Sequence, residues 1–252
     1  MHNKNLLHKP LETKQLPKGI PYIIANEAAE RFSFYGMKAI LVVYMTQYLF
    51  ISHGETNISE ENAKGYFHLF TSAVYFFPIF GALISDIFFG KYKTIIALSL
   101  IYCLGHLVLA IDPSILGLSL GLIFISIGSG GIKPCVSAHL GDQFSKTNSS
   151  FISRAYSWFY IAINLGAFTS TLITPYLLKH YSPTIAFAVP GIFMVLATLF
   201  FWAGRYRFIH IKPEGKKTLL ELKKSKKIKI ILKIFTLFIF VSFFWCLFDQ
   251  TG

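Results

Sequence analysis

Long apolar stretches follow one another along almost the whole chain, and they restrict its fold more than any other feature. Seven of them are long enough for a helix to cross a bilayer, for which about 20 residues suffice. They are residues 20–51, 64–89, 94–111, 115–136, 155–178, 184–203 and 230–250. The sequence therefore predicts an all-α integral membrane protein with seven transmembrane helices.

The composition excludes an ordinary soluble domain. Of the 252 residues, 54% are hydrophobic and 14% are charged, whereas about a quarter of the residues in a soluble domain are charged. The three cysteines lie within apolar stretches and have neither a disulfide framework nor metal-ligand spacing. We therefore expect no metal site. The net charge of +12 has a different explanation from nucleic-acid binding, because of where the basic residues lie.

Lysine and arginine are concentrated in the N-terminal tail and in every second connection between the apolar stretches. Cytoplasmic loops of membrane proteins carry such an excess. We therefore expect the tail and these connections to be cytoplasmic, in an inner or plasma membrane, with the lipid bilayer rather than nucleic acid as partner. The predicted parts are a cytoplasmic tail, a six-helix bundle, a basic cytoplasmic linker and a seventh helix, at residues 1–19, 20–203, 204–229 and 230–252.

A stripe of ionisable side chains lies inside the first apolar stretch. Glu27, Glu30 and Arg31 are spaced so that they share one face of a helix, and Tyr35 and Lys38 extend that face. Ionisable residues within a membrane span are costly, and as a rule they face the protein interior and carry function. The stripe predicts a transport site, and a structural salt bridge between helices is the alternative.

Further polar side chains lie inside later stretches. Lys133, in a span that is otherwise nearly uncharged, needs an anionic partner such as a substrate carboxylate, unless it reaches the membrane surface. Asn164 is expected to be a buried amide, and both it and Tyr75 can contact substrate or another helix. Trp245 and Asp249 lie one helical turn apart in the last stretch. Asp249 is either interfacial or the counter-charge for Lys38.

A charged cluster follows the second apolar stretch, in the segment SDIFFGKYK. Asp86 precedes Gly90, Lys91 and Lys93, and such a cluster can form a gate, or Asp86 can simply terminate the helix. The spacing resembles the loop signature of the major facilitator superfamily, although Ile87 replaces its usual basic residue.

Four segments together resemble the proton-dependent oligopeptide transporter family, a branch of the major facilitator superfamily. They are EAAERFSFYG, GSGGIKPCVSAHLGDQF, FYIAINLGAF and FWCLFDQTG, at residues 27–36, 128–144, 159–168 and 244–252. The first matches the family motif ExxERFxYYG except at Phe34, which lacks a hydroxyl. Lys38 takes a place that is usually held by arginine.

The resemblance implies proton-coupled symport of di- and tripeptides by alternating access, without a cofactor. It assigns proton coupling to Glu27, Glu30, Arg31, Lys38 and Asp249. It assigns substrate contacts to Arg31, Tyr35, Tyr75, Lys133, Asn164 and Trp245. Symport of nitrate or another small anion is an alternative, since the visible pocket is cationic.

Family members have at least twelve helices in two halves, so the resemblance implies that the seventh helix begins a C-terminal half that is missing here. We expect transport to require that half or a second chain. A non-transporting membrane fragment or assembly partner is the alternative. No nucleophile or phosphate-binding loop accompanies the polar stripe, and we therefore expect no enzyme.

Overall fold

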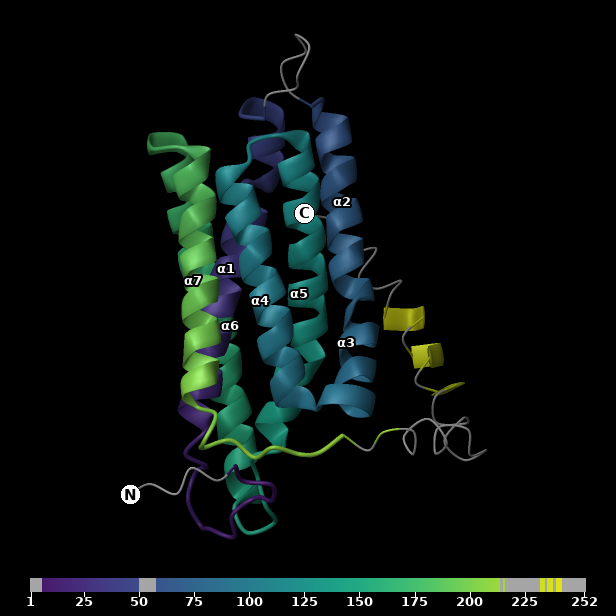
Figure 1. The fold of residues 1–252 in the computed structure, drawn as a ribbon, viewed down its shortest axis with the longest axis vertical. Coiled ribbons are helices and arrows are strands. Elements are labelled where there is room, and N and C mark those ends of the chain that lie inside the picture. Colours follow the sequence, from purple (N-terminus) through teal and green to yellow (C-terminus); the bar gives the residue numbers. More distant parts are fainter. Residues whose placement is uncertain are drawn as a thin grey trace.

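The computed structural model describes residues 6–49, 58–213 and 215, together with 232–233, 235–237 and 239–241. Most of these residues form a bundle of long, roughly parallel helices (Figure 1). The elements are α1 (Ile20–Gln47), α2 (Glu60–Phe76), α3 (Pro78–Ile84), the π-helix η1 (Ser85–Phe89), α4 (Lys91–Ile111), α5 (Ile115–Gly141), the 3₁₀-helix η2 (Ser149–Phe151), α6 (Ile152–His180) and α7 (Pro183–Ala203).

Within the described residues, five helical segments are long and apolar enough to cross a membrane. They are Glu60–Phe89, Lys91–Ile111, Ile115–Gly141, Ser149–His180 and Pro183–Ala203. Helix α1 has the length of a span at 28 residues, but the charged stripe interrupts its apolar sequence. The prediction of an all-α membrane protein is confirmed. The count of six spans plus a seventh stays a prediction, because most of residues 230–252 lie outside the described part.

The helices differ from the predicted stretches mainly at polar ends. Helix α5 continues to Gly141 instead of ending near residue 136, and α1 ends at Gln47 instead of near residue 51. The second stretch is not one regular helix. Pro78 has no N–H to donate, so it begins α3 as a separate helix. Hydropathy therefore locates the spans, whereas backbone hydrogen bonding sets their ends.

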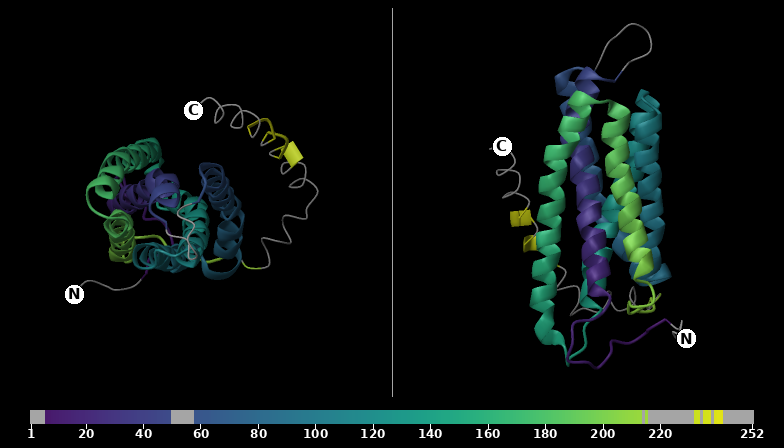
Figure 2. Two further views of the ribbon diagram at one scale, coloured as in Figure 1. Left: turned by 90° about the horizontal axis from the view of Figure 1, so that it is seen from above. Right: turned by 90° about the vertical axis from the view of Figure 1, so that its left-hand side faces the viewer.

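Helix α1 is enclosed by its neighbours. It packs against α6 and α7 and also contacts α2, while α4 packs against α5 and α7. Viewed end-on, α1 lies between α2 and the pair α6 and α7 (Figure 2). Its side chains Ile23, Met37 and Leu41 are fully buried. The charged stripe on this helix is therefore held inside the bundle.

Glycines at positions 128, 130 and 131 allow α5 to approach its neighbours closely. A Cβ on Gly128 would lie 2.6 Å from the Cβ of Tyr102 in α4, and one on Gly130 would lie 2.8 Å from the carbonyl oxygen of Val74 in α2. The close approach of α3 involves Gly131. These positions bring α2, α3 and α4 against one helix.

We expect Gly81→Ala to lower the stability of the bundle. A Cβ on Gly81 would overlap the backbone of Gly131, which cannot move aside as a flexible side chain can, and overpacking typically costs about 1–3 kcal/mol. The matched control is Gly65→Ala in α2, where nothing lies within 4 Å and alanine is the better helix former. Melting temperatures of the two variants in detergent make the comparison, and equal losses would contradict the packing described.

The tail and the basic connections lie at one end of the bundle. The N-terminal tail, the turn before α4, the loop between α5 and α6 and the segment after α7 all lie at its lower end in Figure 1. Leu7 forms a parallel bridge with Ile209, and the N–H of His210 donates to the carbonyl oxygen of Leu7 at 2.7 Å. The basic segments therefore lie at the same end of the bundle, as expected from basic residues that alternate between successive connections.

Candidate functional site

The predicted stripe forms a buried cluster on α1. Glu27 and Glu30 are each 2% exposed and Arg31 is 9% exposed. The Nε–H of Arg31 donates to Oε1 of Glu27 at 2.7 Å, and Nε lies 3.1 Å from Oε2 of Glu30. The Nε–H of Arg31 can point at only one acceptor, and it points at Glu27. Within the described part of the chain, the Glu30 oxygens accept no hydrogen bond. Two buried carboxylates thus share one guanidinium, and Glu30 is the less well satisfied.

A close crossing of α1 and α6 fixes the position of this cluster. A Cβ on Gly166 of α6 would lie 2.9 Å from the backbone nitrogen of Phe32 and 3.1 Å from the Cβ of Arg31. Further along α1, a Cβ on Gly36 would lie 2.6 Å from Oγ1 of Thr174. Because a glycine lies at each contact, α1 and α6 approach each other closely beside Arg31.

Lys133 of α5 belongs to the same site. Its Nζ lies 4.7 Å from the ring centroid of Phe34 and 5.2 Å from that of Tyr75, distances at which a cation is attracted to an aromatic face. The charges of Glu30 and Arg31 also act on it. The ion pairs found among the described residues do not include Lys133. Its positive charge is therefore available to an anionic ligand.

Other predicted residues surround Lys133. Tyr35 is half-buried and packs edge-on against Phe34 with centroids 5.4 Å apart. Tyr75 is 71% exposed. The Nζ of Lys38 lies 5.1 Å from the ring centroid of Phe67 in α2, and its charge acts on Lys133. The structure therefore gathers these groups where α1, α2 and α5 face one another.

Asn164 is not part of this group around Lys133, although the family resemblance assigned it a substrate contact. The residue is exposed, and its Nδ2 donates to the carbonyl oxygen of Tyr160 in its own helix at 2.8 Å. Gly166 faces α1, and two residues correspond to about 200° of rotation on a helix, so Asn164 points to the other side of α6. The expectation of a buried amide is wrong for the described bundle.

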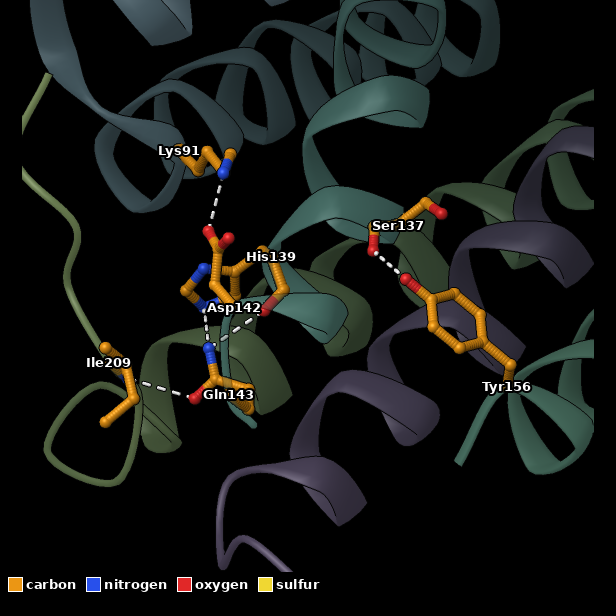
Figure 3. Close-up of polar contacts among 7 residues, drawn as sticks. All are labelled: Lys91, Ser137, His139, Asp142, Gln143, Tyr156 and Ile209. Carbon is orange, nitrogen blue, oxygen red and sulfur yellow. Dashed lines mark hydrogen bonds and ion pairs between the residues drawn. The ribbon is translucent and has the colours of Figure 1, made fainter. Parts of the chain in front are cut away.

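The charged cluster near α4 has a partner that sequence reasoning missed. Lys91 pairs with Asp142, with Nζ 2.6 Å from Oδ2 (Figure 3). Asp86 and Lys93 are exposed, and Asp86 lines a cavity together with Lys91 and Lys212. The ion pair thus joins the start of α4 to the end of α5. Asp142 belongs to the segment LGDQF, but a spacing of 51 residues gave no sign of this contact.

Neighbouring contacts tie the end of α5 to other segments. Gln143 donates through Nε2 to the carbonyl oxygen of His139 at 2.9 Å, and its Oε1 accepts from the N–H of Ile209, also at 2.9 Å (Figure 3). The Tyr156 hydroxyl donates to the carbonyl oxygen of Ser137 at 3.0 Å. The Tyr156–Ser137 bond links α6 to α5, and the Gln143–Ile209 bond links the end of α5 to the segment after α7. These contacts connect helices and loops at the basic end of the bundle.

Two predicted site residues, Trp245 and Asp249, lie outside the described residues. The pairing of Lys38 with Asp249 therefore stays a prediction. Within the described ranges, no group of three or more His, Cys, Asp or Glu residues is arranged to hold a metal ion. The site described so far is a set of carboxylates, cations and aromatic rings.

Comparisons with known proteins found relatives of this chain. A model of the POT family matches residues 92–220. Peptide transporter family 1 of Drosophila melanogaster is 37% identical over 94% of this chain and 37% of its own length. Solute carrier family 15 member 2 of Rattus norvegicus is 44% identical over 79% of this chain and 28% of its own. The crystal structure of the POT family transporter PepTSo is 50% identical, with a TM-score of 0.75 over 80% of this chain and 40% of that one. The chain thus spans less than half the length of these relatives.

Proposed function

The chain belongs to the POT family, and on this premise we propose that it supplies half of a transporter that carries di- and tripeptides together with protons across a cell membrane. One observation carries the proposal. Two buried carboxylates share the guanidinium of Arg31, beside the ammonium of Lys133, which is not part of their ion pairs. Relatives are named peptide transporters, and this site suits such a substrate.

The chemistry of the site explains how peptide and proton binding favour each other. A short peptide has a carboxylate that is attracted to Arg31 and Lys133. While Glu27 and Glu30 are ionised, they compete for the guanidinium. Protonation of either carboxylate leaves Arg31 freer to bind substrate, and linkage requires that bound peptide favours protonation in return.

Alternating access requires two bundles that move against each other around a central site. We propose that the helices described here form one bundle and that a C-terminal half or a second chain supplies the other. The basic tail and connections at one end of the bundle support a cytoplasmic N-terminus in an inner or plasma membrane. A transporter of this kind is not an enzyme.

Uptake into proteoliposomes tests the substrate. The complete gene product should accumulate labelled dipeptide when the outside is acidic. Unlabelled dipeptides and tripeptides should compete, because they present the same carboxylate and backbone groups. Nitrate should not compete, since it lacks the backbone groups. Competition by nitrate alone would favour the small-anion symporter instead.

A further inference from the structure

Two aromatic rings hold the ammonium group of Lys133, which lies on α5. Its Nζ is 4.7 Å from the ring centroid of Phe34 on α1 and 5.2 Å from that of Tyr75 on α2. Both distances lie within the reach of about 6 Å at which a cation is attracted to an aromatic face. We call these two rings the aromatic clamp. Side chains from three helices thus meet at one ammonium group.

The two rings of the clamp differ in how firmly they are held. Phe34 is 4% exposed, and its ring stacks on that of Phe70 in α2, which is also 4% exposed, with centroids 6.3 Å apart. Tyr75 is 71% exposed. Phe34 is therefore the fixed side of the clamp, supported by Phe70, and Tyr75 is its exposed side.

The other cation of the site is held in the opposite way. Arg31 is bound by the carboxylates of Glu27 and Glu30, so an anionic ligand has to compete with two negative charges for its guanidinium. An aromatic ring attracts a cation through the partial negative charge of its face and carries no net charge. The clamp therefore leaves the positive charge of Lys133 available to an anion.

The clamp also orders a flexible side chain. Lysine has a four-carbon stem with many rotamers, and a ligand that binds a freely moving lysine has to immobilise it, which lowers affinity. Between the two rings, the Lys133 ammonium is in place before a ligand arrives. A glutamate or aspartate partner would order the lysine as well, but it would also neutralise the charge.

A ring that only packs is found elsewhere in the bundle. Phe187 of α7 is fully buried, and it meets Tyr44 of α1 edge-on with centroids 4.9 Å apart. In the described part of the chain, no lysine or arginine lies over its face. Phe34 differs because its ring contacts the packed Phe70 ring and also a charged group of the candidate site.

We propose that Phe34, supported by Phe70, and Tyr75 are positioning residues that hold the Lys133 ammonium ready for the carboxylate of a bound peptide. This inference rests on the proposed function in one respect, namely that the ligand of Lys133 is a peptide carboxylate. The ring faces carry the effect, so the hydroxyl that Phe34 lacks is not needed for it.

Equilibrium binding of labelled dipeptide to the complete gene product in detergent measures the role of the clamp. Phe34→Leu removes the ring face and keeps an apolar side chain. It should lower the affinity roughly two- to tenfold, because binding then has to order one long side chain. Phe34→Tyr keeps the face and should bind like the wild type. Tyr75→Leu should weaken binding in the same way, whereas Tyr75→Phe should not.

Three comparisons separate positioning from packing. In a Lys133→Ala background, Phe34→Leu should cause no further loss of affinity, because there is no ammonium left to hold. An amidated dipeptide, which lacks the carboxylate, should bind equally to the wild type and to Phe34→Leu. Phe187→Leu removes the ring that only packs, and it should lower the melting temperature without changing the affinity for dipeptide.

Three results would overturn the proposal. They are an unchanged dipeptide affinity in Phe34→Leu, an equal loss for the free and the amidated dipeptide, and an equal loss with and without Lys133→Ala. If Phe34→Leu does not fold, Tyr75→Leu against Tyr75→Phe decides the matter, since Tyr75 is exposed and its replacement leaves the core intact.

Melting temperatures without substrate make the failure of the two proposals distinguishable. Phe34→Leu and Lys133→Ala remove the same contact, so the double variant should lose less than the sum of the two single losses. Such coupling in a protein that binds no dipeptide would overturn the peptide function and leave the clamp as the support of Lys133. Dipeptide binding that is insensitive to Phe34→Leu would overturn only the role of the clamp.

Discussion

Arg31→Met should abolish proton-driven dipeptide uptake and strongly destabilise the bundle. Arg31 is the cation that Glu27 and Glu30 share, and both carboxylates are 2% exposed. Removing one partner of a buried ion pair leaves an uncompensated charge and typically costs about 3–5 kcal/mol. Substrate also loses the guanidinium proposed to bind its carboxylate. Melting temperature and uptake into proteoliposomes measure the two effects.

The chain offers a matched control for this substitution. Lys64 and Glu60 form a pair at the same distance of 2.7 Å, but their side chains are 59% and 72% exposed. Such a surface pair contributes about 0–1 kcal/mol, so Lys64→Met should change little. Adding Glu27→Gln to Arg31→Met should restore part of the stability without restoring uptake. Wild-type stability in Arg31→Met would contradict the buried arrangement.

Lys133→Ala should weaken dipeptide binding while the bundle remains folded. The ammonium is held by the rings of Phe34 and Tyr75 and is not part of the ion pairs of the stripe, so its removal leaves no described carboxylate unpaired. A charge-assisted hydrogen bond to substrate is worth about 1.5–3 kcal/mol, which corresponds to roughly a ten- to hundredfold loss of affinity. Equilibrium binding of labelled dipeptide to the purified protein measures it.

An amidated dipeptide tests which group Lys133 binds. Its affinity should depend little on Lys133, because the carboxylate is absent. Lys93→Ala, at an exposed position of α4, should leave both affinities unchanged. If Lys133→Ala weakened the amidated peptide and left the free dipeptide unaffected, Lys133 would not be its carboxylate partner.

Local spacing was enough to predict the stripe. The intervals between Glu27, Glu30 and Arg31 place them on one helical face whatever surrounds that helix, and the helix around them could be expected from its apolar neighbours. Spacing could not show that the Nε–H of Arg31 points to Glu27 and leaves the Glu30 oxygens without a hydrogen bond. Which carboxylate accepts this hydrogen bond depends on side-chain rotamers and on the helices packed around α1.

Contacts between distant segments could not be predicted in the same way. The Lys91–Asp142 pair and the bridge between Leu7 and Ile209 depend on how helices and tail are arranged in three dimensions. The contact between His106 and Ser33 was missed for a related reason. A single histidine in an apolar stretch shows nothing unusual until Ser33 is found 2.7 Å from its ring.

Dipeptide-driven proton movement tests the central claim most directly. Proteoliposomes that contain the complete gene product and a pH-sensitive dye in the lumen receive external dipeptide at equal pH on both sides and with the inside electrically negative. We predict that the lumen acidifies, that nitrate in place of dipeptide gives no acidification, and that Arg31→Met abolishes the signal. Dipeptide entry without acidification, or acidification with nitrate alone, would contradict the coupling of protons to peptides at this site.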